Sequence, residues 1–125
     1  MSIHEGKSTI IGVIQICSKN DIEANFEKLR VYIGECAMRG ARMVCLPENF
    51  AFMGATSEET NLMKEPLEGP LIQRYRELAI QNNVWLSLGG FQESIVGSSK
   101  RYSTQINKNA CRHSLDNRPS GFDCC

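Results

Sequence analysis

The segment MVCLPENFAFMG, from Met43 to Gly54, places a single carboxylate between a short apolar run and a group of apolar and aromatic residues. Glu48 directly follows the apolar run, and Phe50, Phe52 and Met53 come after it. Apolar neighbours would remove water from around the carboxylate, and a dehydrated carboxylate binds a proton more readily. This pattern favours Glu48 as a general base. On position alone, a solvated loop glutamate is the alternative interpretation, because charged residues near strand ends also occur without function.

Two further reactive side chains follow another predicted strand. Cys17 comes directly after the apolar run from Ser8 to Ile16, and Lys19 lies two residues further on. If this strand neighbours the one before Glu48, all three residues share the sheet edge where open parallel sheets bind ligands. Nucleophilic catalysis also requires the thiol and its base within hydrogen-bonding distance and an aligned oxyanion stabiliser. Three separate loop residues rarely meet that demand, so we do not expect Cys17 to be a nucleophile.

The remaining cysteines predict no additional site. Cys45 lies in an apolar strand and is expected to be inert, because burial disfavours the thiolate. Cys111, His113, Cys124 and Cys125 are zinc-ligand types, but adjacent cysteines rarely chelate one ion and the chain has no Cys-x2-Cys pair. We therefore expect exposed thiols in this segment, with no metal and no cofactor.

Strand and helix patterns alternate along the first part of the chain. The run from Ser8 to Ile16 is almost continuously apolar, as in a strand covered on both faces. From Asn20 onward the apolar period changes to three or four residues, which predicts an amphipathic helix. Asn20 and Glu23 form a capping pair at its start, and Gly40 can adopt the left-handed conformation that ends it.

The same alternation continues after this helix. A second strand, residues 41–46, stops at Pro47, and a second helix opens at Gly69 and Pro70. A third strand, VWLSLGGF, begins at Val84, and we expect its tryptophan, Trp85, to pack in the core. The order strand, helix, strand, helix, strand is typical of an α/β fold with parallel strands.

The amino-acid composition limits the kinds of molecule that the chain is expected to bind. The 125 residues contain 14 basic and 14 acidic side chains, so no overall field attracts nucleic acid or an anionic membrane. The amino-terminal residues lack a secretory signal pattern, and no apolar run is long enough to span a bilayer. We therefore expect a cytoplasmic protein whose cysteines are free thiols and whose partners include neither nucleic acid nor membrane.

Two segments carry a family resemblance: VCLPENFAFMG, and EPLEGPLIQRYRELAIQNNVWLSLGGFQE, which ends at Glu93. Together they resemble the amino-terminal part of the nitrilase, or carbon-nitrogen hydrolase, superfamily, in its branch of deaminated glutathione amidases. The resemblance implies an αββα sandwich, a homodimeric assembly, a small amide substrate and a Glu-Lys-Cys catalytic set. Glu48 matches the general base of that set.

The chain departs from the family pattern after Glu93. It has no segment resembling YRKxHLFD, which supplies the lysine, or CYDLRFPE, which supplies the nucleophile. RYSTQI, residues 101–106, resembles the family's next strand only faintly. We assign residues 8–97 to the amino-terminal portion of the hydrolase domain and residues 98–125 to a divergent tail without a packed structure.

We therefore interpret the chain as a truncated form of such an amidase. With most of one sheet missing, apolar faces would be open, and we expect marginal stability and a tendency to associate. Such a chain would be inactive alone. The alternative function is that of a non-catalytic fragment that associates with full-length subunits.

Overall fold

The computed structural model describes residues 6, 8–94 and 102–105 of the chain. Strands and helices alternate along it, as the sequence predicts. In chain order the elements are β1 (Ile10–Val13), α1 (Ile22–Met38), β2 (Ala41–Cys45), α2 (Ser57–Met63), α3 (Pro70–Asn82), β3 (Trp85–Ser87), β4 (Gly90–Glu93) and β5 (Tyr102–Gln105).

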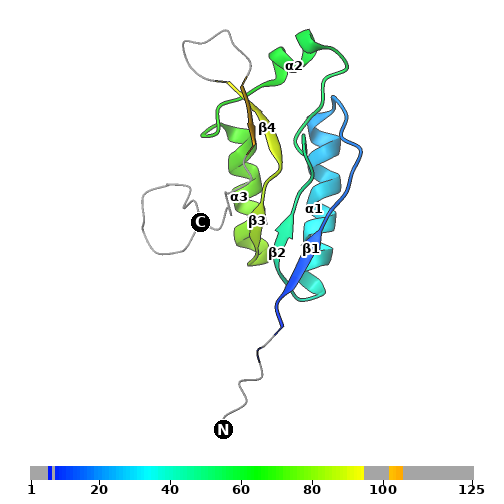
Figure 1. The fold of residues 1–125 in the computed structure, drawn as a ribbon, viewed down its shortest axis with the longest axis vertical. Helices are drawn as coiled ribbons and strands as arrows, with labels where there is room; N and C mark the ends of the chain where they lie inside the picture. Colours follow the sequence, from blue (N-terminus) through cyan, green and yellow to red (C-terminus); the bar gives the residue numbers. More distant parts are fainter. Residues whose placement is uncertain (1–5, 7, 95–101, 106–125) are drawn as a thin grey trace.

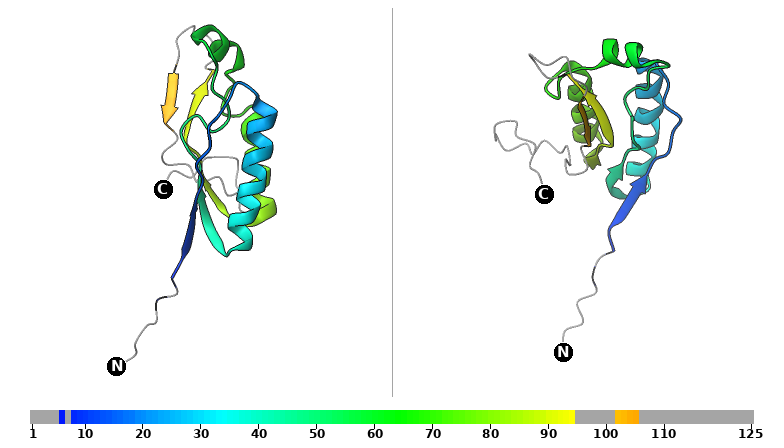
Figure 2. Two further views of the ribbon diagram at one scale, coloured as in Figure 1. Left: turned by 90° about the vertical axis from the view of Figure 1, so that its right-hand side faces the viewer. Right: turned by 45° about the horizontal axis from the view of Figure 1, so that its top comes forward.

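The first three strands form a parallel sheet in the order β1-β2-β3 (Figure 1). Both long helices, α1 and α3, lie against the same face of this sheet, so that strands and helices form two layers (Figure 2). β4 leaves the parallel sheet and pairs antiparallel with β5. The architecture is therefore α/β, as predicted.

The core fills the space between this sheet and the two helices. Val44 and Leu86 project from the sheet toward the helices and are fully buried. The helices contribute Leu29, Ile33, Ile72 and Ala79, none of which is exposed to solvent. Gly12 brings β1 close to α1, because a Cβ atom there would lie 2.7 Å from the Cys36 sulfur.

The helix boundaries agree with the sequence prediction, except at the start of α1. Asp21, and not Asn20, caps this helix, and its side chain accepts a hydrogen bond from the Ala24 amide at 3.0 Å. Asn20 instead donates to Glu59 of α2 at 2.7 Å. At the other end, Gly40 has the predicted left-handed conformation, with a φ of 89°.

The first strand is shorter and more exposed than its sequence predicts. We expected a strand over residues 8–16 covered on both faces, but β1 is an edge strand of four residues. The side chains of Ile11 and Val13 are 56% and 79% exposed. Among the described residues, helices cover only one face of the sheet, so the second apolar face of β1 stays open.

Two other sequence predictions are wrong in detail. The predicted third strand is divided into two strands with different partners, since β3 pairs with β2 and β4 pairs with β5. Trp85 is 36% exposed on the open face of the sheet and does not belong to the core. The helix α2 was not predicted, since none of its residues is buried and it has no apolar stripe.

One core side chain has an unusual polar group. Tyr75 of α3 is fully buried, with its ring 5.1 Å from that of Phe26 and 5.0 Å from that of Phe50. Its hydroxyl has no hydrogen-bond partner among the described residues. Burial raises the pKa of the Tyr75 phenol far above its ordinary value, so the group stays neutral.

Replacement of this hydroxyl should stabilise the fold. We predict that Tyr75→Phe raises the free energy of unfolding by about 1 kcal/mol, because an unpaired buried polar group is removed while the ring packing is kept. Urea denaturation at fixed protein concentration measures the change. The control Tyr32→Phe, at an exposed tyrosine, should change stability by less than about 0.5 kcal/mol. A loss of stability in Tyr75→Phe would contradict the prediction.

Candidate functional site

Glu48 lies in a turn that is hydrogen-bonded to the chain segment after β3. The Leu46 amide donates to the Ser87 carbonyl at 2.9 Å, and the Asn49 amide donates to the Gly90 carbonyl at 3.0 Å. Between these two bonds the chain forms a turn, in which Asn49 adopts a left-handed conformation with a φ of 53°. Asparagine tolerates this conformation better than most residues. The turn is thus fixed at both of its ends.

Two glycines make room for this turn. A Cβ atom at Gly89 would lie 1.9 Å from the Pro47 carbonyl oxygen, so only glycine allows this backbone approach. A Cβ atom at Gly90 would lie 3.2 Å from Cγ of Glu48, so the glutamate stem runs directly over Gly90. The motifs LPEN and LGGF therefore act as one structural unit, which sets the position of the Glu48 carboxylate at the carboxyl edge of the parallel sheet.

The aromatic residues after Glu48 have a different role from the one predicted. The Glu48 side chain is exposed, whereas Phe50 and Phe52 are buried in the core. The Phe52 ring packs edge-on against Phe91 at 5.9 Å, and Met53 is 55% exposed. We predicted that these residues would shield the Glu48 carboxylate from water. This prediction is wrong, because among the described residues the glutamate stays exposed. Instead, the phenylalanines anchor the loop that carries the carboxylate.

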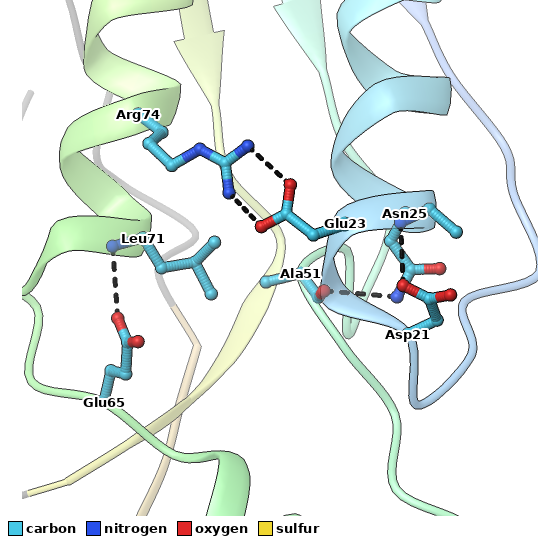
Figure 3. Close-up of polar contacts among 8 residues, drawn as sticks. Asp21, Glu23, Asn25, Ala51, Glu65, Leu71 and Arg74 are labelled. Carbon is cyan, nitrogen blue, oxygen red and sulfur yellow. Dashed lines mark hydrogen bonds and ion pairs between the residues drawn. The ribbon is translucent and has the colours of Figure 1, made fainter.

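A buried amide joins this loop to the one after β1. Asn25 of α1 is only 4% exposed, and its side chain accepts from the Lys19 amide at 3.0 Å. It also donates to the Lys19 carbonyl oxygen at 2.7 Å. A further bond, to the Ala51 carbonyl oxygen at 3.2 Å, is drawn in Figure 3. Asn25 was not among the residues predicted from the sequence. Its position three residues after Ile22, on the apolar face of a helix, is the signal that could have revealed it.

Figure 3 shows polar contacts near the starts of α1 and α3. Arg74 forms two hydrogen bonds with Glu23, at 2.6 and 2.9 Å, and its guanidinium lies 3.8 Å from the centre of the Phe26 ring. The bond from Arg74 lowers the pKa of Glu23. Glu65 accepts from the Leu71 amide at 3.1 Å and so caps the start of α3. We assign these residues to the support of the site.

Cys17 and Lys19 lie in the loop after β1, at the same edge of the sheet as Glu48. Both side chains are exposed. Among the described residues, no hydrogen bond or ion pair joins either of these side chains to Glu48, and Lys19 is held only through its backbone. The structure thus offers no contact between a described thiol and the candidate base.

The other thiols do not supply a nucleophile to this edge. Cys36 packs between α1 and β1, and burial raises the pKa of its thiol. Cys45 lies half-buried in β2. Within the described part of the chain, no three histidine, cysteine, aspartate or glutamate side chains are grouped to hold a metal ion. Cys111, His113, Cys124 and Cys125 lie outside the described residues.

The sequence matches the family model for carbon-nitrogen hydrolases over residues 10–111. The chain belongs to the carbon-nitrogen hydrolase family. The match includes β5, which agrees with the similarity of residues 101–106 to the family's next strand. The boundary between residues 97 and 98 stays a prediction. None of the helices that the structure describes has the length and apolar composition needed to cross a membrane.

Deaminated glutathione amidases are among the relatives of this member of the carbon-nitrogen hydrolase family. The Bos taurus protein is 43% identical over 84 residues, and the Dictyostelium discoideum protein is 44% identical over 90 residues. These alignments cover 67% and 69% of this chain but only 26% and 31% of the relatives. The chain thus spans between a quarter and a third of the length of these two relatives.

A solved structure agrees with this assignment. The crystal structure of the C. elegans NitFhit protein superposes with a TM-score of 0.67 at 32% sequence identity. The superposition covers 76% of this chain and 23% of the NitFhit chain. The α/β fold of the carbon-nitrogen hydrolase is therefore supported by sequence and by structure.

The close approach at Gly89 gives a test of the turn. We predict that Gly89→Ala lowers the free energy of unfolding by at least about 2 kcal/mol, because the new methyl group overlaps the Pro47 carbonyl. Urea denaturation measures the loss. The matched control is Gly34→Ala in α1, where the nearest atom to a new Cβ is 3.8 Å away. This control should gain about 0.5 to 1 kcal/mol, since alanine favours a helix interior. Equal stability of the Gly89→Ala variant and the wild type would contradict the observed turn.

Proposed function

We propose that this chain supplies the general base, Glu48, of an amidase site that hydrolyses a carbon-nitrogen bond in a small molecule. The observation that carries the proposal is the position of Glu48. Its turn is fixed against Gly89 and Gly90 at the carboxyl edge of a parallel sheet, where ligands of such sheets bind. The exposed carboxylate is free to accept a proton from a group that approaches this edge.

The family resemblance implies the chemistry that such a base would serve. Glu48 would accept the proton of a cysteine thiol, and the thiolate would attack the amide carbon. A lysine would stabilise the negative oxygen that develops, ammonia would leave, and water would hydrolyse the thioester. The 125 residues contain no segment that resembles the family's lysine or cysteine motif. We infer that these two groups must come from further polypeptide, and that the 125 residues are inactive alone.

Deaminated glutathione is the proposed substrate. Amidases of this compound share 43% and 44% identity with the chain over 84 and 90 residues. We infer that the chain contributes the base and its turn. The contacts around Glu48 do not identify residues that would bind the rest of the substrate. The support for deaminated glutathione therefore comes from the relatives alone.

A hybrid enzyme tests this proposal. Residues 10–94 of this chain would replace the matching segment of the Bos taurus amidase, which supplies the remaining residues. We predict that the hybrid releases ammonia from deaminated glutathione and that Glu48→Gln lowers kcat by at least about 100-fold, as expected for the loss of a general base.

The matched control in the hybrid is Glu58→Gln. Glu58 is an exposed glutamate of α2, and its replacement should leave kcat unchanged. Circular dichroism would establish that each variant is folded. Full activity of the Glu48→Gln hybrid would contradict the assignment of the base, whereas a folded but inactive wild-type hybrid would contradict the substrate.

A non-catalytic role in association with full-length subunits is the second candidate function. The open apolar face of the parallel sheet, with Ile11, Val13 and Trp85 exposed, favours it. This role needs no base at residue 48. The effect of Glu48→Gln on the hybrid therefore separates the two functions.

A further inference from the structure

A buried amide of α1 connects the two loops that carry Lys19 and Glu48. The Asn25 side chain donates to the Ala51 carbonyl at 3.2 Å, as Figure 3 shows. It also donates to the Lys19 carbonyl at 2.7 Å, and its oxygen accepts from the Lys19 amide at 3.0 Å. The nitrogen and the oxygen of this side chain are therefore both bonded, and every partner is a backbone group of a loop.

The Lys19 carbonyl also joins the two loops directly. It accepts from the Met53 amide at 2.9 Å, so one oxygen contacts both Asn25 and the chain segment after Glu48. The backbone at residues 51–53 is thus bonded to α1 and to the loop after β1. Asn25 is the centre of this network, since two of its bonds end on Lys19 and the third ends on Ala51.

The position of Asn25 on α1 would otherwise suit an apolar side chain. Phe26 and Leu29 of the same helix are buried in the core, and Asn25 itself is only 4% exposed. Burial of an amide costs free energy unless its polar atoms are paired. An apolar side chain here would deprive the Lys19 amide and the Ala51 carbonyl of these partners. The loops, and not the packing of the helix, therefore explain an asparagine at this position.

Glu48 lies only three residues before the carbonyl that Asn25 binds. On its other side, the turn is held by the bond from the Asn49 amide to the Gly90 carbonyl at 3.0 Å. Between these two bonds, Phe50 is fully buried. The segment from residue 49 to residue 51 is thus short and held at both ends. A shift of the backbone at Ala51 would therefore be transmitted to the turn that carries the carboxylate.

We propose that Asn25 is a positioning residue for the Glu48 carboxylate, a role that rests on the proposed general base. Among the described residues no hydrogen bond joins Asn25 to Glu48, so Asn25 acts through the backbone at Ala51. A misplacement of about 1 Å can slow a catalysed step by about 100-fold. Loss of the Asn25 bonds should therefore lower kcat and leave KM nearly unchanged, because the base acts in proton transfer.

Amide hydrogen exchange of the full 125-residue chain tests the contact without any assay of activity. We expect Asn25→Leu to raise the exchange rate of the Met53 amide at least about tenfold through local opening, while the amides of α3 keep their wild-type rates. Asn25→Asp, which keeps the size of the side chain but lacks the amide donors, should have the same effect. The matched control is Asn82→Leu, which removes an amide that donates to the Leu78 carbonyl at 2.9 Å within α3. This control should leave the exchange of Met53 unchanged.

The hybrid enzyme described above tests the consequence for catalysis. In it, both Asn25 variants should lower kcat by about 10- to 100-fold and change KM by less than about twofold, whereas Asn82→Leu should leave both constants unchanged. Circular dichroism would show that the variants are folded. An unchanged kcat in an active hybrid would overturn the positioning role. Exchange at Met53 that is unchanged, or that rises equally throughout α3, would also overturn it. An inactive wild-type hybrid would instead contradict the proposed amidase function, and the exchange at Met53 would still decide whether Asn25 holds the loop.

Discussion

The Pro47 carbonyl lies against Gly89 at a distance that leaves no room for a side chain, and the position of Glu48 depends on this contact. The sheet pairing of β2 and β3 ends at this point, and the chain segments after both strands touch backbone to backbone. The Asn49 amide then bonds to Gly90, so the turn cannot move away from the sheet. A carboxylate on a loop thereby gains a defined position, as catalysis requires.

Buried side chains transmit this constraint to the rest of the structure. Phe50 and Phe52 insert the chain after Glu48 into the core, and Asn25 bonds the backbone at Ala51 to the loop after β1. A buried amide with three hydrogen bonds fixes the relative position of these loops more closely than apolar contacts would, because each bond has a direction. Hydrogen bonds and buried side chains thus hold the carboxyl edge of the sheet where Glu48 lies.

Local patterns in the sequence predicted α1, α3 and the position of Glu48 just after β2, since apolar periodicity and the helix ends at Gly40 and Gly69 depend only on nearby residues. The sequence did not predict which faces would be covered. The apolar run of β1 suggested burial on both faces, yet the described residues cover only one. Whether Phe50 and Phe52 face the carboxylate or the core depends on a turn fixed by Gly89, some forty residues away in the chain. Such contacts between distant segments have no local signature.

The central claim is that the 125 residues supply the base Glu48 but no nucleophile. The most direct test is to measure ammonia release from deaminated glutathione by the purified chain. The measurement compares the wild type with Glu48→Gln and Cys17→Ser at matched concentration. We predict no release above buffer for any of the three proteins, since no described thiol contacts Glu48. Release by the wild type that is lost in both variants would contradict it, because Cys17 would then act as the nucleophile.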